Sequence, residues 1–268
     1  AAGRLQWTFE KTDGTFIVEG NSDFENVQPG TLQDVAQLDI ALPPWTDAAA
    51  CILRVTASFN GTQLENEWKF WVFPKVEDAE NENVLCASEL TGETLEHVAE
   101  GGALLLTGGF PACSETEVFR TCTSGRSLGH AGTVVHNHPI WRRFPQEGFA
   151  DWQFYPLMTK SHSLVQDAQM PVFTPILELI PCFKRIRRKS LIAEFSVGKG
   201  RMIVCGFNFQ KDDPAVRWMK HVLTEYLSGG NYTSAPIWDV KELRSRLGIV
   251  FTERARRLID AGGRPVES

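Results

Sequence analysis

Hydrophobic and polar positions alternate with a period of two along residues 5–73, and turn signals such as Asp13-Gly14 and Asn60-Gly61 interrupt the alternation. Side chains two residues apart share a face of a strand, so this pattern predicts antiparallel β-strands with one buried face. About five such strands are visible, whereas an immunoglobulin-like sandwich has seven or more. We therefore expect residues 1–74 to form an all-β immunoglobulin-like sandwich that is truncated on its N-terminal side.

The pattern changes after the polar, acidic stretch "KVEDAENEN", residues 75–83, which we interpret as a linker. A short apolar run, "VLCAS", is followed by the amphipathic segment "GETLEHVAEG" and a second apolar run, "ALLLTGG". A strand, a helix and a strand in this order predict a βαβ unit, and such units build parallel sheets that helices cover on both faces. We expect residues 84–231 to form an α/β domain with a mostly parallel sheet.

The later part of this domain carries two further signals. "SLIAEFSV" and "RMIVCGFNF" flank Gly198-Lys199-Gly200, which predicts a hairpin or two adjacent strands. Asp212-Asp213-Pro214 then predicts the capped start of a helix, "AVRWMKHVLTEYLSGG". Residues 232–268 are polar and we expect a partly ordered helical tail.

Charge separates the two regions and limits the function classes. The chain has a net charge of -6, which argues against a nucleic-acid partner because phosphate binding needs a basic field. Residues 1–74 carry the whole imbalance. No apolar run approaches the ~18 residues of a membrane span, so we expect a soluble chain with no membrane partner, either cytoplasmic or secreted or periplasmic.

The usual signals of catalysis and of metal binding are missing from the sequence. No G-x-S-x-G or G-x-C-x-G elbow is present, and Cys113 lies in a loop that contains proline. The six cysteines form no C-x-x-C pair or zinc spacing, so we expect no metal and no cofactor. Cys51, Cys86 and Cys205 lie in apolar runs and are expected to be buried. "KRIRRK", residues 184–189, is expected to be a solvated connection, or else a site for an acidic partner or glycan.

The segment "HNHPIWRRFPQEGFADWQF", residues 136–154, concentrates the residue types of a functional site. His136 and His138 would share a face of an extended chain and could bind a metal together with Asp151. No third close ligand follows from the spacing, so structural histidines are the other interpretation. The candidate binding residues in this segment are His136, His138, Trp141, Arg142, Asp151 and Trp152.

Several motifs, in order, give the chain a resemblance to a known family. These motifs are "NEWKFWVFP", "HPIWRRFPQEGFADWQFYPLM", "TPILELI", "LIAEFSVGKGRMIVCGFNF" and "DPAVRWMKHVLTEYL". Together they resemble the C-terminal accessory region of bacterial glycoside hydrolase family 2, the β-galactosidase and β-glucuronidase relatives. The resemblance implies an immunoglobulin-like domain followed by an α/β domain similar to the class I glutamine amidotransferase fold. It covers about residues 5 to 230.

The resemblance also implies a non-catalytic function. The two catalytic glutamates of that family lie on an upstream barrel, so no residue here inherits their role. It makes Trp68, Phe70 and Trp71 residues of the sandwich end, and Trp141, Phe144, Asp151 and Trp152 anchors of a packed loop.

We accordingly expect a non-catalytic accessory fragment with a structural, interdomain-packing or auxiliary glycan-binding role. Its partners would be the upstream catalytic barrel and possible glycans. The alternatives are a stand-alone carbohydrate-binding protein and a small hydrolase that uses the α/β domain.

Overall fold

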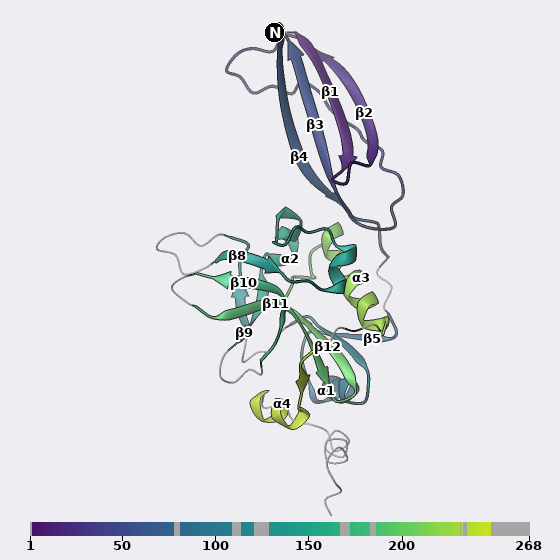
Figure 1. The fold of residues 1–268 in the computed structure, drawn as a ribbon, viewed down its shortest axis with the longest axis vertical. Coiled ribbons are helices and arrows are strands. Elements are labelled where there is room, and N and C mark those ends of the chain that lie inside the picture. Colours follow the sequence, from purple (N-terminus) through teal and green to yellow (C-terminus); the bar gives the residue numbers. More distant parts are fainter. Residues whose placement is uncertain are drawn as a thin grey trace, which may run out of the picture. The chain divides into compact units, whose positions relative to one another are not determined.

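The computed structural model of the chain describes residues 2–77, 81–108, 114–120, 129–166, 172–182, 186–230, 232 and 235–247. The chain divides into two compact units, Ala1–Pro74 and Lys75–Ser268, and each is described below by itself (Figure 1). The division falls where the sequence predicts the linker to begin. The predicted tail is described only as far as residue 247, and the rest of it lies outside the described residues.

The first unit is a four-stranded antiparallel sheet with the strand order β2-β1-β3-β4. Its strands are β1 (Gly3–Lys11), β2 (Phe16–Phe24), β3 (Ala49–Phe59) and β4 (Thr62–Val72). Leu5, Phe9, Phe24 and Cys51 are buried on one face, as the period-two alternation predicts. Trp68 and Phe70 of β4 are each 45% exposed, so this face is only partly covered.

The predicted sandwich is wrong for the first unit, because its described residues form one sheet and not two. A sandwich buries the inner faces of two sheets against each other. Residues 25–48, in which "DVAQLDIALP" looks like a strand, have no regular secondary structure. Val35 and Leu42 of that segment are exposed, so its alternating apolar residues meet no opposing sheet.

The second unit is built around a nine-stranded sheet with the main order β5-β6-β12-β11-β10-β8, to which β7, β9 and β13 attach. Its strands are β5 (Val84–Ala87), β6 (Ala103–Leu106), β7 (Ser114–Glu117), β8 (His130–Val135), β9 (Ser161–Gln166), β10 (Pro175–Pro181), β11 (Arg188–Val197), β12 (Gly200–Cys205) and β13 (Ile237–Trp238). Its helices are α1 (Gly92–Ala99), α2 (Tyr155–Met158), α3 (Pro214–Ser228) and α4 (Val240–Leu247), with the short 3-10 helices η2 (Pro139–Arg143) and η3 (Trp152–Phe154).

The predicted mostly parallel sheet, and with it the amidotransferase-like fold, is contradicted by the strand pairing. Parallel pairing joins β5 to β6, β6 to β12 and β11 to β13. The pairs β8 with β10, β10 with β11, β11 with β12, β11 with β9 and β7 with β9 are antiparallel. A parallel crossover needs about a dozen residues or more. The stretches that connect β10 to β11 and β11 to β12 are too short for one, so these strands reverse direction instead.

Smaller parts of the prediction are confirmed. β5, α1 and β6 form the predicted βαβ unit, with β5 and β6 parallel. β11 and β12 form the predicted hairpin, and Asp213 caps α3 by accepting a hydrogen bond from the Ala215 N–H at 2.8 Å. On the inner face of α3 the buried residues include Val216, Met219, Val222, Leu223 and Leu227. These buried residues belong to the core of the second unit.

Among the cysteines, Cys51 and Cys205 are buried as predicted, whereas the prediction for Cys86 is wrong because that residue is exposed. Cys86 lies in β5, which forms the edge of the sheet, and an edge strand leaves one side uncovered. Cys182 is disulfide-bonded. Cys113 and Cys122 lie outside the described residues.

Candidate functional site

His136 directly follows β8 and is held by a carboxylate on the neighbouring strand β10. Its ring Nε2 lies 2.8 Å from Glu178 Oε2, and its backbone N–H donates to the Ile176 carbonyl at 3.0 Å. A carboxylate only accepts hydrogen bonds, so Nε2 carries the proton that it donates to Glu178, and in a neutral ring Nδ1 is then left as an acceptor. Arg188 approaches the other oxygen of Glu178 at 3.6 Å.

His138 is a structural cap as well as a partner of a second carboxylate. It has an extended backbone and precedes Pro139, which occupies the first turn of η2. Its Nδ1 accepts a 3.4 Å hydrogen bond from the Ile140 N–H, and its Nε2 donates to Glu194 Oε2 at 3.0 Å. Both ring nitrogens are therefore engaged, which fixes the ring orientation and its neutral tautomer.

Glu194 is the centre of a buried polar network within the apolar strand β11. The residue is 3% exposed. Besides the His138 ring, the Tyr226 hydroxyl lies 3.1 and 3.0 Å from its two oxygens, and Arg201 Nη1 lies 3.7 Å from Oε1. A buried carboxylate without partners would cost several kcal/mol, roughly 3–5 when a pair is broken. Donors from the cap of η2, from α3 and from β12 thus satisfy this carboxyl group inside the sheet layer.

A pocket of about 150 Å³ lies where these two histidine and carboxylate pairs meet. Its polar walls include His136, Asn137, His138, Thr174 and Glu194. Proline, isoleucine and alanine side chains form the rest, from Pro175, Ile176, Ala235 and Pro236. Two of the six predicted site residues, His136 and His138, therefore line one cavity.

Trp141 and Arg142 do not join them at this pocket. Trp141 is 7% exposed and packs edge-on against Phe144 and Phe154, as expected for an anchor of the loop. Arg142 is exposed. The adjacent Arg143 makes the ion pair with Glu225.

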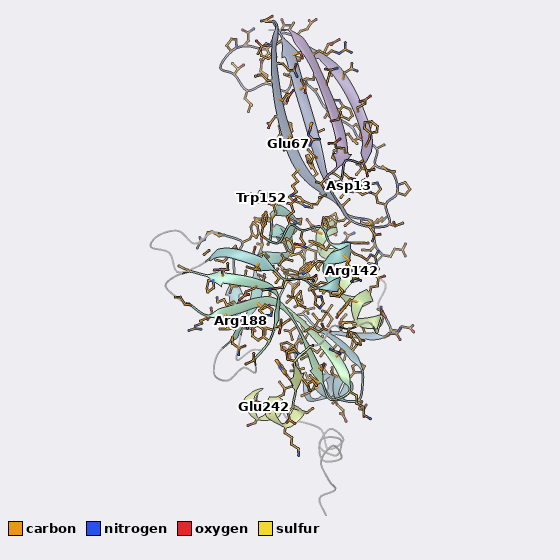
Figure 2. The ribbon with its side chains drawn as sticks, viewed as in Figure 1. Asp13, Glu67, Arg142, Trp152, Arg188 and Glu242 are labelled. Atoms are coloured by element: carbon orange, nitrogen blue, oxygen red, sulfur yellow. The ribbon has the colours of Figure 1, made fainter. Side chains whose placement is uncertain are left out.

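Asp151 and Trp152 lie in η3 and its cap, and the two have different roles. Asp151 accepts a hydrogen bond from the Trp152 N–H at 2.8 Å, so its carboxylate caps the short helix. Trp152 is 67% exposed, which contradicts its predicted role as a packed anchor (Figure 2). Its ring contacts Phe119 at 5.9 Å and Tyr155 at 6.0 Å between centroids. We call Phe119, Trp152 and Tyr155 the aromatic cluster.

A second buried group of charges, which the sequence did not indicate, joins β7, β9 and β11. Lys189 Nζ lies 2.7 Å from both Glu115 Oε2 and Glu117 Oε1, and Ser163 donates to Glu117 at 2.5 Å. Burial alone would lower the pKa of Lys189, but the two carboxylates raise it above its ordinary value. Arg187 also pairs with Glu115.

The described part of the basic run "KRIRRK", residues 186–189, therefore pairs with carboxylates of the same chain. The prediction of a solvated connection is wrong for Lys189, which is buried. Arg188 and Arg187 meet carboxylates of β10 and β7 respectively. Residues 184 and 185 lie outside the described residues.

Among the residues that the structure describes, no group of three or more His, Cys, Asp or Glu side chains could hold a metal ion. His136, His138 and Asp151, which could have bound a metal together, each contact a different protein group. In the same described part of the chain, no helix has the length and hydrophobicity needed to cross a membrane.

The polar partners of the two histidines, Glu178, Glu194, Arg201 and Tyr226, are not identified by the sequence pattern, and neither are Phe119 and Tyr155 of the aromatic cluster. Glu178 and Glu194 did leave a signal, because each is a single carboxylate inside an apolar run, "PILELI" and "LIAEFSV". A charged residue in a buried strand needs a partner. Nothing in the sequence says which histidine each of them meets.

Two family models match the chain. Residues 85–247 match the family described as Domain of unknown function (DUF8487), and residues 1–74 match the family described as Domain of unknown function (DUF8488). The comparison with curated proteins gives no match.

Proposed function

Because the chain belongs to the family described as Domain of unknown function (DUF8487), whose description assigns no activity, we propose a function from the geometry of its own residues. The chain is a non-catalytic accessory part of a larger enzyme and binds carbohydrate. The observation that carries this proposal is the exposure of the aromatic cluster, in which Trp152 is 67% and Tyr155 46% exposed.

The aromatic cluster has the chemistry of a sugar-stacking surface. Tryptophan and tyrosine join an apolar ring to a polar tip, which suits partly hydrated binding surfaces. The ring centroids of Phe119 and Tyr155 lie 5.6 Å apart, edge to face, and both rings contact Trp152. The three rings therefore support each other's positions. Lys211 Nζ lies 5.3 Å from the Tyr155 ring centre and adds a hydrogen-bond donor beside the rings. By contrast, the buried Trp141 offers no surface to a ligand.

The surroundings of His138 and Asp151, two of the candidate binding residues, favour binding over turnover. A general base needs a nitrogen or oxygen that can reach the substrate proton. Both nitrogens of His138 are engaged by protein groups, and the Asp151 carboxylate accepts the Trp152 N–H. A small hydrolase that uses His138 or Asp151 as its base is therefore the weaker alternative.

The parent enzyme that we propose is a family 2 glycoside hydrolase, with its catalytic barrel upstream of this chain. Support for this parent comes only from the order of the sequence motifs, from "NEWKFWVFP" to "DPAVRWMKHVLTEYL". The amidotransferase-like part of that resemblance is excluded by the strand pairing and forms no part of the proposal.

The test is calorimetric titration of the purified chain with β-galactosides, β-glucuronides and their oligomers. Trp152→Ala should weaken binding at least tenfold, about 1.4 kcal/mol, because stacking area is lost. Phe149→Ala removes another exposed ring of the same segment, one outside the aromatic cluster, and should leave the affinity unchanged as the matched control.

Two results would contradict the proposal. Hydrolysis of aryl β-glycosides by the chain would refute its non-catalytic part. Absence of binding across the panel would refute the glycan-binding part. If Trp152 is then protected from oxidation in the full parent protein but not in this chain, its role is packing between domains.

A further inference from the structure

The pocket between His136 and Glu194 is separate from the aromatic cluster in its lining residues and in its chemistry. Its polar walls carry carboxylate, imidazole, amide and hydroxyl groups, and none of the three cluster rings lines it. Both features lie around β8: Phe119 contacts His130 at the start of this strand, and His136 follows its end. The pocket therefore calls for its own explanation.

Both carboxylates around the pocket are already balanced by cations of the protein. Arg201 lies 3.7 Å from Glu194, and Arg188 lies 3.6 Å from Glu178. An incoming anion would meet these carboxylates, and an incoming cation would compete with arginines that already pair with them. Charge balance thus favours a neutral ligand.

The groups that remain available can both donate and accept hydrogen bonds, as hydroxyl groups do. His136 Nδ1 accepts, the Asn137 amide does both, and the Thr174 hydroxyl does both. Pro175 and Ile176 supply an apolar wall for carbon-bound hydrogens. Glu178 fixes the His136 ring through its 2.8 Å bond, so the free nitrogen keeps one direction.

Size sets the upper limit of the ligand. A pocket of about 150 Å³ has room for several water molecules, and so for one small molecule but not for an oligosaccharide. We propose that this pocket binds one small neutral polyol or a single sugar unit, with His136 Nδ1 accepting a hydrogen bond from a ligand hydroxyl. The site is independent of the aromatic cluster and of the glycan binding proposed there.

The experiment follows the imidazole nitrogens by long-range ¹H–¹⁵N NMR while glycerol, D-galactose or D-glucose is added to the full chain. Saturable shifts are expected at His136 Nδ1, and none at His162, an exposed histidine of β9 that serves as the internal control. Sodium acetate and ammonium chloride, the charged probes, should give no saturable shift. A saturable shift of His136 with cellobiose or lactose would mean that the pocket binds the terminal sugar of a glycan. A shift with glycerol or a monosaccharide alone would mean that it binds a free polyol or sugar.

Two variants make the site falsifiable. Thr174→Val, followed by the shift at His136, and His136→Phe, followed by calorimetry, should each weaken the binding of the responding probe at least tenfold. Thr174 is exposed, so its change leaves the core intact. Trp152→Ala should leave this binding unchanged, which separates a failure here from a failure of the aromatic cluster. The inference is overturned if no neutral probe shifts His136, if acetate or ammonium saturates the site instead, or if both pocket variants bind as the wild type does.

Discussion

Replacing Glu194 by alanine is the perturbation that most directly tests how the buried network is held. The side chain accepts hydrogen bonds from His138 and Tyr226, and it is the partner of Arg201. Glu194→Ala removes the shared acceptor and leaves three donor groups behind. If the network is a structural support for the pocket wall, its loss should appear in the free energy of unfolding.

The size of the loss follows from the exposure of each donor. Removing one partner of a buried ion pair costs about 3–5 kcal/mol, and a buried donor without an acceptor about 1–3 kcal/mol. The Arg201 side chain is 23% exposed and can reach water, whereas the His138 side chain is 7% exposed and cannot. We therefore expect about 4 kcal/mol, or a fall in Tm of about 8–16 °C for a unit of this size.

Urea titration followed by circular dichroism measures this loss, with Tyr226→Phe as the graded control. That variant removes one half-buried hydroxyl and should cost about 1 kcal/mol. A double-mutant cycle of Glu194→Ala with His138→Ala should show coupling, because the two side chains share a hydrogen bond. If Glu194→Ala costs under about 1 kcal/mol, or stabilises the chain, the network is not a structural support and the carboxylate is retained for function.

Two further predictions concern a glycine and a histidine. Gly206→Ala should destabilise the chain by about 3 kcal/mol, because the new Cβ would lie 1.6 Å from the His162 carbonyl oxygen. In the control Gly132→Ala the nearest atom to the new Cβ is 3.7 Å away, so this change should be neutral. Equal thermal midpoints of the two variants would refute the prediction. Burial lowers the pKa of His130 below 6.5 despite the nearby Glu117 charge, so the unfolded chain binds the proton first and stability is lost as pH falls below about 6.5. Urea midpoints from about pH 7 to about pH 5 should fall more steeply in the wild type than in His130→Phe, and parallel curves would contradict it.

The sequence predicts local elements of this fold better than the sheet that joins them. The period of the apolar residues and the cap at Asp213 are local signals, and the βαβ unit and α3 follow from them. Strand direction is not local. An apolar run such as β11 is typical of parallel strands covered on both faces, yet β11 is buried and pairs with β9, β10 and β12 in antiparallel directions.

The candidate site was predicted in part for the same reason. His136 and His138 were identified from residue type and spacing, and they do line one pocket. Their partners Glu178 and Glu194 are 42 and 56 residues away in the chain, so only the strand pairing brings them together. Trp152 and Trp141 have the same residue type in one short segment, and only the packing of the loop decides that the first is exposed and the second buried.

Trp152 is the residue that we propose to contact a carbohydrate. Incorporation of 5-fluorotryptophan gives each of the eight tryptophans its own ¹⁹F NMR signal, which Trp152→Phe assigns. Addition of a β-galactoside or β-glucuronide oligomer should shift the Trp152 signal saturably and leave those of Trp141 and the 45% exposed Trp68 in place. A saturable shift at another tryptophan while the Trp152 signal stays in place, or no shift with any oligomer, would show that Trp152 is not the carbohydrate contact.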